Sequence, residues 1–143
     1  ITQGVTVVRA AGNDGGPGDS GPSTCFGDVD PWFLTADGIT VGATDDQDRR
    51  AQFPAGGWSQ SGPCVDVSAP GLHVPTYFNG SIQWTFSGTS AATPLVAGAA
   101  ALYLQTHPNA SPSAVESAIK RQATDGVVTG LYADSPNRLL FVR

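Results

Sequence analysis

Two stretches of the chain, residues 5–10 (VTVVRA) and 39–44 (ITVGAT), are almost continuously apolar and rich in β-branched side chains. This pattern predicts strands that are buried on both faces of a parallel sheet. Residues 64–71 (CVDVSAPG) predict a third strand, which ends at its Pro-Gly pair. Between residues 77 and 86, an Asn-Gly pair separates two runs of β-forming residues, which is a strong signal for a hairpin.

Two helices are predicted after the hairpin. Residues from about 90 to 105 are apolar around the whole helix, and a helix without a polar stripe is expected to be buried on all sides. The second helix follows Ser111, a suitable N-cap, has Pro112 at its first position and ends near Gly126. A short strand over 139–142 ends the pattern. This order of elements predicts an α/β layered domain.

The composition narrows the class of protein. The 143 residues, 40% of them hydrophobic, are enough for a sizeable core, and we expect one domain over 1–143. The formal net charge is -5 and the few basic residues are scattered, which argues against a nucleic-acid or anionic-membrane partner. The apolar run within 95–104 is too short to span a bilayer. Many glycines and prolines with little charge are typical of a loop-rich secreted enzyme.

The two cysteines, Cys25 and Cys64, leave two interpretations open. They are either buried free thiols or a disulfide, and a disulfide would place the protein outside the cytosol. Two cysteines alone do not indicate a structural zinc site. Cys25 lies in a stretch from Asp14 to Gly38 that is dense in turn-forming residues, and a loop of this length usually carries function or a cross-link.

Ser90 stands at a predicted strand-to-helix junction. A serine there is suited to nucleophilic catalysis, because the turn exposes its hydroxyl and the helix N-terminus directs backbone N–H groups toward developing negative charge. The alternative is a serine that only caps the helix. The Gly-x-Ser-x-Gly elbow of α/β-hydrolases is incomplete, since Ala92 takes the place of its second glycine.

The motif GTSAATPLVAG around Ser90 resembles the active-serine segment of subtilisin-like serine peptidases, and VVRAAGND resembles their oxyanion segment. ITVGATDDQDRRAQF, CVDVSAPG and SPNRLLF are similar to the proteinase K and aqualysin branch. The resemblance implies the C-terminal half of a subtilisin-like α/β fold, with a largely parallel sheet flanked by helices. It also implies a serine endopeptidase that acts through an acyl-enzyme without a cofactor, with Ser90 as nucleophile and Asn13 as oxyanion-hole donor. From spacing alone, Asn13 would be a turn residue.

The rest of the family's catalytic triad is not matched in this sequence. In subtilisin-like peptidases the catalytic Asp and His precede the oxyanion segment, whereas His73 and His107 stand in other surroundings and are expected in exposed loops. We therefore expect a C-terminal portion that needs the N-terminal half of the same peptidase domain for activity. Two alternatives stay open: a non-catalytic scaffold or binding fragment, and a complete hydrolase that uses His73 or His107 as its base.

The same branch implies two further features. One is a structural calcium ion held by Asp66 and by the carbonyl groups of Ala36 and Gly38, which are oxygen ligands of the kind that calcium prefers. From the sequence alone, Asp66 is also interpreted as a carboxylate that caps a strand end. The other feature is a disulfide between Cys25 and Cys64, together with a secreted location. Peptides or proteins are the implied substrates.

Overall fold

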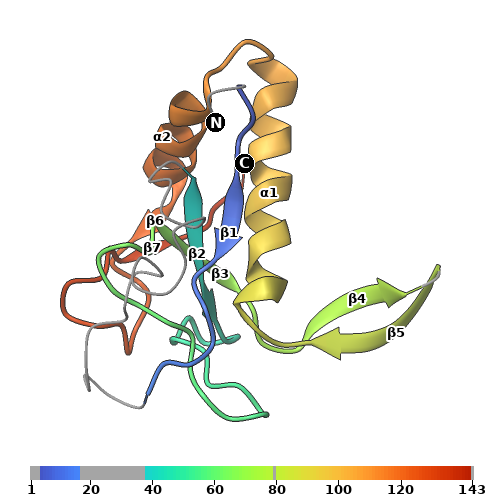
Figure 1. Ribbon diagram of the computed structural model, residues 1–143, viewed down its shortest axis with the longest axis vertical. Coiled ribbons are helices and arrows are strands. Elements are labelled where there is room, and N and C mark those ends of the chain that lie inside the picture. The colour runs from blue at the N-terminus through green and yellow to red at the C-terminus, as the bar shows by residue number, and fades with distance from the viewer. Residues whose placement is uncertain (1–3, 17–37, 79, 143) are drawn as a thin grey trace.

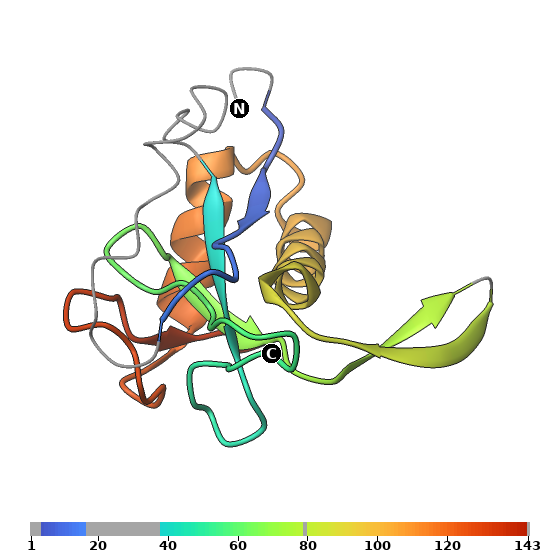
Figure 2. The same ribbon diagram turned by 60° about the horizontal axis from the view of Figure 1, so that its bottom comes forward.

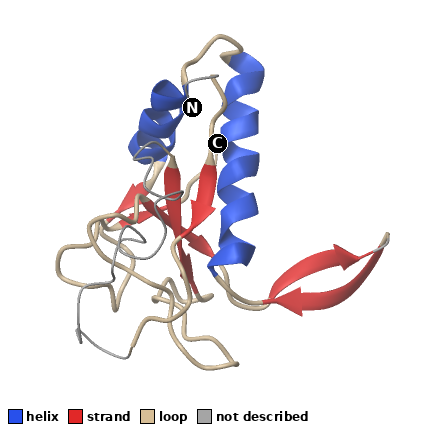
Figure 3. Cartoon of the chain, viewed as in Figure 1, coloured by secondary structure: helices blue, strands red, loops and turns tan. Residues whose placement is uncertain are grey.

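The computed structural model describes residues 4–16, 38–78 and 80–142 (Figure 1). Strands β1, β2, β3, β7 and β6 form one sheet in that spatial order, and β4 and β5 form a separate hairpin (Figure 3). In chain order, the elements of the described part are β1 (Val8–Ala10), β2 (Ile39–Thr44), β3 (Val67–Pro70), β4 (Val74–Phe78), β5 (Ser81–Phe86), α1 (Thr89–Thr106), α2 (Pro112–Gln122), β6 (Thr124–Asp125) and β7 (Arg138–Leu139).

The larger sheet is mostly parallel. β1 pairs parallel with β2, β2 with β3, and β3 with β7, whereas β6 runs antiparallel to β7. α1 packs against β1, β2 and β3, and also against α2. These observations confirm the α/β class and a largely parallel sheet flanked by helices. The core contains the fully buried side chains of Ile39, Val41, Val67, Val96 and Val115.

β2 matches the predicted strand and is buried along its whole length, but the prediction for the first strand was too long. Only Val8–Ala10 forms a strand, and the side chains of Val5 and Val7 before it are 59% and 41% exposed. The reason is that β1 lies at the edge of the sheet and pairs with β2 alone within the described residues. The first apolar run, which is typical of a central strand, therefore contains an edge strand in the described sheet.

α1 begins and ends close to the predicted positions, but the prediction that it is buried on all sides is wrong. Its inner face, which includes Ala92 and Val96, is buried against the sheet. On its outer face, defined here by Leu95, Gly98 and Leu102, the two leucines are 39% and 54% exposed. No element of the described chain covers this face. The apolar sequence of α1 therefore produces an exposed apolar stripe.

α2 has the predicted N-cap, because the Ser111 hydroxyl accepts a hydrogen bond from the backbone N–H of Ala114 at 3.2 Å. The helix ends at Gln122, short of the predicted end, since the next residues leave it to form β6 and pair with β7. β7 is in turn shorter than the predicted last strand, and only Arg138 and Leu139 belong to it.

The charged turn after β2 is organised by Asp45. Its carboxylate accepts hydrogen bonds from the backbone N–H groups of Gln47 and Arg49 at 2.9 and 3.0 Å, and from the Arg49 guanidinium at 2.8 Å. Burial would raise the pKa of Asp45, but these hydrogen bonds outweigh burial and lower the pKa below its ordinary value.

The predicted hairpin is present as β4 and β5, and it projects from the body of the molecule in both ribbon views (Figures 1 and 2). Asn79, the first residue of its predicted turn, lies outside the described residues. The base of the hairpin is closed where the backbone N–H of Gly88 donates to the carbonyl of Gly71 at 2.8 Å. Beside it, the backbone N–H of His73 donates to the Ser87 hydroxyl at 3.0 Å.

Candidate active site

Asn13 and the start of α1 are far apart in the sequence but in contact in the structure. The side-chain oxygen of Asn13 accepts two hydrogen bonds from Thr89, one from its backbone N–H and one from its hydroxyl, both at 2.9 Å. The Thr89 hydroxyl accepts a further bond from the backbone N–H of Gly12 at 3.1 Å. Since Oδ1 of Asn13 is engaged in this way, its Nδ2 amide is the group that remains as a hydrogen-bond donor.

Ser90 is the second residue of α1, and the interpretation of this serine as a helix cap is wrong. The N-cap is Gly88, which has no side chain, and the capping bond to the first turn comes from Asn13 instead. Ser90 is exposed, and neither its hydroxyl nor its backbone N–H has a hydrogen-bond partner among the described residues. The first turn of α1 contains no acidic residue. The positive end of the helix dipole is therefore not neutralised beside Ser90.

A small space at Gly88 separates two N–H donors. Gly88 has a φ of +148°, which favours glycine. A Cβ atom at this position would lie 3.3 Å from Nδ2 of Asn13 and 3.7 Å from the backbone nitrogen of Ser90. Both donors therefore flank the same point, next to the exposed serine. Two N–H groups arranged in this way are suited to bind an oxyanion.

Contacts behind Asn13 hold the loop that follows β1. Gly15 exchanges two backbone hydrogen bonds with Trp58, at 3.0 and 2.9 Å. The buried guanidinium of Arg50 donates to the carbonyl of Gly16 at 2.6 Å and lies 5.2 Å from the centre of the Trp58 ring. These contacts fix the backbone that follows Asn13 relative to the segment that contains Trp58.

Both histidines are exposed, as predicted, and neither is hydrogen-bonded to Ser90. His107 is the C-cap of α1, and its ring stacks on Tyr103 with the centroids 4.2 Å apart. At about 1.5 Å of rise per residue, His107 lies about 25 Å from Ser90 along the helix. The His73 ring makes no hydrogen bond within the described part of the chain.

Asp66 directly precedes β3, and both of its carboxylate oxygens are engaged. Oδ2 accepts a hydrogen bond from the backbone N–H of Thr40 at 2.8 Å, which is the strand-end capping that the sequence left open. Oδ1 lies 2.6 Å from Nζ of Lys120 on α2, and the same Nζ lies 2.5 Å from Oε1 of Glu116. Burial disfavours the charge of Lys120, but its hydrogen bonds to the two carboxylates outweigh burial and raise its pKa.

In this arrangement, a calcium ion at Asp66 would have to displace the donors that both carboxylate oxygens already have. Calcium takes about six to eight oxygen ligands, whereas the oxygens of Asp66 are occupied by an ammonium group and a backbone amide. Within the described ranges, no group of three or more His, Cys, Asp or Glu side chains is placed to hold a metal. Gly38 is described, but Ala36 lies outside the described residues, so the calcium site stays a prediction.

Three residues with clear roles here, Thr89, Arg50 and Lys120, were not identified from the sequence. The sequence did contain a signal for Thr89, because it places a second hydroxyl group directly before Ser90 at the strand-to-helix junction. Lys120 is the only lysine of the chain. Nothing in the local sequence connects Arg50 with a carbonyl 34 positions away. The predicted disulfide stays a prediction, because Cys25 lies outside the described residues.

Comparison with known proteins identifies the family. Residues 1–135 match the Subtilase family, which covers most of the chain. The chain belongs to this family. It is 47% identical over 143 residues to the extracellular serine proteinase of Thermus sp. (strain Rt41A), and 42% identical over 142 residues to alkaline serine exoprotease A of Vibrio alginolyticus. Its fold is similar to the crystal structure of a cold adapted subtilisin-like serine proteinase, with a TM-score of 0.79 and 32% sequence identity.

This subtilase chain spans only part of the proteins that it matches. Each comparison covers 99% of the chain, but this corresponds to 32% of the Thermus protein, 24% of the Vibrio protein and 46% of the chain in the crystal structure. The resemblance to subtilisin-like peptidases and the fold that it implied are confirmed. The names of these relatives describe serine proteases, which are longer proteins. The function of this chain is therefore argued from the geometry of its own site.

Proposed function

We propose that this subtilase chain carries the nucleophile and the oxyanion hole of a serine endopeptidase, which cleaves peptide bonds in peptides or proteins. The observation that carries the proposal is the pair of donors at Gly88. Nδ2 of Asn13 and the backbone nitrogen of Ser90 lie 3.3 and 3.7 Å from one point, beside an exposed serine hydroxyl. The serine proteinases among the relatives support the same reaction class.

In the proposed reaction, Oγ of Ser90 attacks the carbonyl carbon of the scissile bond while a histidine accepts the hydroxyl proton. The π electrons of the carbonyl move to its oxygen, and the oxyanion accepts hydrogen bonds from Asn13 Nδ2 and the Ser90 N–H, near the positive end of α1. When the intermediate collapses, the C–N bond breaks and the leaving amine takes the proton from the histidine. Water then hydrolyses the acyl ester on Ser90.

The histidine and its aspartate come, in this proposal, from a further segment of the same peptidase domain. Two surfaces are suited to receive that segment. The open edge of β1 has backbone N–H and C=O groups that can pair with another strand. The outer face of α1 exposes Leu95 and Leu102, which a packed neighbour would bury. The match covers 46% of the chain of the solved relative, so that protein has enough additional sequence for such a segment.

Labelling with a fluorophosphonate, which reacts with activated serines, tests this proposal. We expect little labelling of the isolated 143-residue chain, because a serine hydroxyl without a base is a poor nucleophile. After addition of a subtilase N-terminal half that contains the catalytic Asp and His, we expect rapid labelling at Ser90. The contrast should be large, since loss of a triad member lowers turnover in subtilisins by roughly a million-fold.

Two variants make the labelling result specific. Ser90→Ala should abolish labelling of the mixture, whereas His73→Ala should leave it unchanged. Rapid labelling of the isolated chain that His73→Ala removes would contradict the proposal and favour a complete hydrolase. A mixture that associates, as seen by gel filtration, but never labels would favour the non-catalytic scaffold.

A secreted location and a disulfide between Cys25 and Cys64 are part of the proposal. The Thermus relative is named as extracellular, which supports the location. Closing a loop of this size with a disulfide would stabilise the fold by about 3 to 4 kcal/mol in the chain-entropy model. Thiol titration of the denatured, unreduced protein should find no reactive sulfhydryl, and two would refute the pairing. Among the described elements, no helix has both the length and the apolar character needed to cross a membrane.

A further inference from the structure

Lys120, Asp66 and Glu116 form a charged cluster at the end of the sheet opposite Ser90. Asp66 precedes β3 and is bonded to Thr40 near the start of β2, whereas Ser90 lies near the other ends of the strands. We propose that the ammonium group of Lys120 takes the place of a calcium ion at Asp66 and acts as a built-in cation that ties α2 to β2 and β3. This inference does not depend on the proposed peptidase activity.

The distances in the cluster match those of a bound cation. Nζ of Lys120 lies 2.6 Å from Oδ1 of Asp66 and 2.5 Å from Oε1 of Glu116. Calcium binds carboxylate oxygens at about 2.3 to 2.6 Å. An ion that used both carboxylates would therefore occupy the position where Nζ now lies. The two cannot be present together, because they would overlap and repel each other.

The second oxygen of Asp66 holds the carboxylate in this orientation. Its hydrogen bond to the backbone N–H of Thr40 ties the side chain to β2 while Oδ1 receives the ammonium group of Lys120. All four lone-pair directions of a carboxylate can accept, but a donor on each oxygen leaves Asp66 paired without a metal. The structural task of a calcium ion, to join the strand end to its neighbours, is already performed by protein groups.

The cluster differs from the exposed ion pair between Arg138 and Asp125. The side chains of Lys120, Asp66 and Glu116 are 27%, 19% and 28% exposed. In contrast, the Arg138 and Asp125 side chains lie 4.0 Å apart, and Asp125 is 80% exposed. Charges that are partly removed from water interact more strongly than exposed ones. Removing the ammonium group would therefore leave two carboxylates near each other without a counter-charge.

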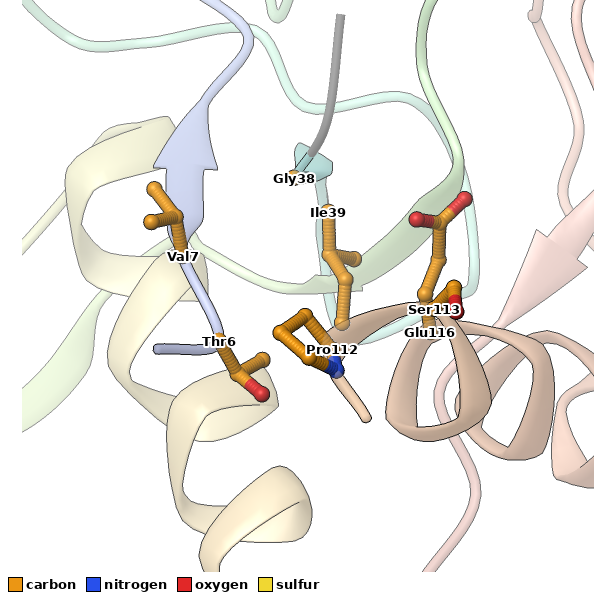
Figure 4. A pocket seen from close by; sticks show the side chains of 7 residues that line it. All are labelled: Thr6, Val7, Gly38, Ile39, Pro112, Ser113 and Glu116. Carbon is orange, nitrogen blue, oxygen red and sulfur yellow. The ribbon is translucent and has the colours of Figure 1, made fainter. Parts of the chain in front are cut away.

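Open space is present beside one member of the cluster, Glu116. A hollow of about 170 Å³ lies between the start of β2 and α2, and Gly38, Ile39 and Glu116 are among the residues that line it (Figure 4). This volume is far above the roughly 15 Å³ that one water molecule needs. An ion therefore has room beside Glu116, and we attribute its exclusion from Asp66 to the charge of Lys120.

Thermal melting with and without calcium tests the inference. For the unmodified protein we expect the same melting midpoint in a chelator and in millimolar calcium chloride. Lys120→Met should lower the midpoint in chelator by roughly 5 °C, because it leaves the two carboxylates uncompensated. Calcium should then raise the midpoint of this variant, since the ion can enter the position that the ammonium group has left.

Matched variants complete the test. Arg121→Met removes the neighbouring positive charge on α2, which is exposed and has no ion pair within the described residues, and should change neither the midpoint nor its calcium response. Lys120→Arg keeps a cation and should stay insensitive to calcium. The inference is overturned if calcium raises the midpoint of the unmodified protein and Asp66→Asn removes that rise. It is also overturned if Lys120→Met melts at the same temperature as the unmodified protein.

Discussion

Replacing Thr89 by valine removes one hydroxyl from the contact between Asn13 and α1 while the side-chain volume is nearly kept. That hydroxyl donates to Asn13 Oδ1 at 2.9 Å and accepts from the Gly12 N–H at 3.1 Å, and Thr89 is fully buried. A neutral hydrogen bond contributes about 0.5 to 1.5 kcal/mol, and a buried donor left unpaired costs about 1 to 3 kcal/mol. Asn13 keeps its bond from the Thr89 backbone, so we expect a loss of about 2 kcal/mol in the free energy of unfolding.

Urea unfolding followed by circular dichroism measures this loss. With a slope of about 2 kcal/mol per molar urea, Thr89→Val should lower the unfolding midpoint by about 1 M. Thr89→Ser keeps the hydroxyl and lacks only the methyl group, so it should fall much less. Equal midpoints for Thr89→Val and the unmodified protein would refute the reasoning. Equal losses for the serine and valine variants would show that the methyl group, not the hydroxyl, supports the contact.

Three further predictions follow from single contacts. Gly57→Ala should unfold at a lower urea concentration than Gly56→Ala, although both glycines have positive φ. A Cβ at Gly57 would lie 2.2 Å from the Asn13 carbonyl oxygen, whereas a Cβ at Gly56 meets nothing within 4 Å. Comparable urea midpoints would contradict this. Leu102→Glu should leave melting of the chain unchanged but weaken its association with a subtilase N-terminal half in gel filtration, and undiminished association would argue against the outer face of α1 as the contact. Asp45→Asn should melt lower than the unmodified protein at neutral pH, and the difference should shrink as the pH falls below about 4. The stabilisation from a lowered carboxyl pKa is fully present above the unfolded pKa and is lost as the pH falls through the folded pKa. A pH-independent difference would exclude this cause.

Elements with a local cause were predictable from the sequence. β2 follows from a short β-branched run, and the start of α2 follows from a serine cap with a proline behind it. The exposure of Leu102 was not predictable in this way. An apolar helix indicates that its side chains pack against other segments, but it does not show which segments these are. The same holds for Val5, whose run is typical of a central strand although it precedes an edge strand.

The site was predictable to the extent that a motif named its residues. Ser90 and Asn13 were identified through the resemblance; Ser90 lies at the start of α1, and Asn13 is hydrogen-bonded to that start through Thr89. The partner of Asn13 is 76 residues away in the sequence, and no periodicity connects positions at that distance. The contact of Lys120 with Asp66 is a second case, since it depends on how α2 is placed beside β3. Long-range pairs of this kind appear only after the chain is folded.

The closed base of the β4–β5 hairpin has a consequence for how this chain can vary. The polypeptide leaves the body after Gly71 and returns at Gly88, and a backbone hydrogen bond joins these two positions directly. The segment between them, which contains the β4–β5 hairpin, has its two ends held together by this hydrogen bond. Its tip can gain or lose residues without shifting the start of α1, because the added length does not pass through the joined ends. Natural insertions, affinity tags or new recognition loops can therefore be accommodated between β4 and β5 while Ser90 keeps its position.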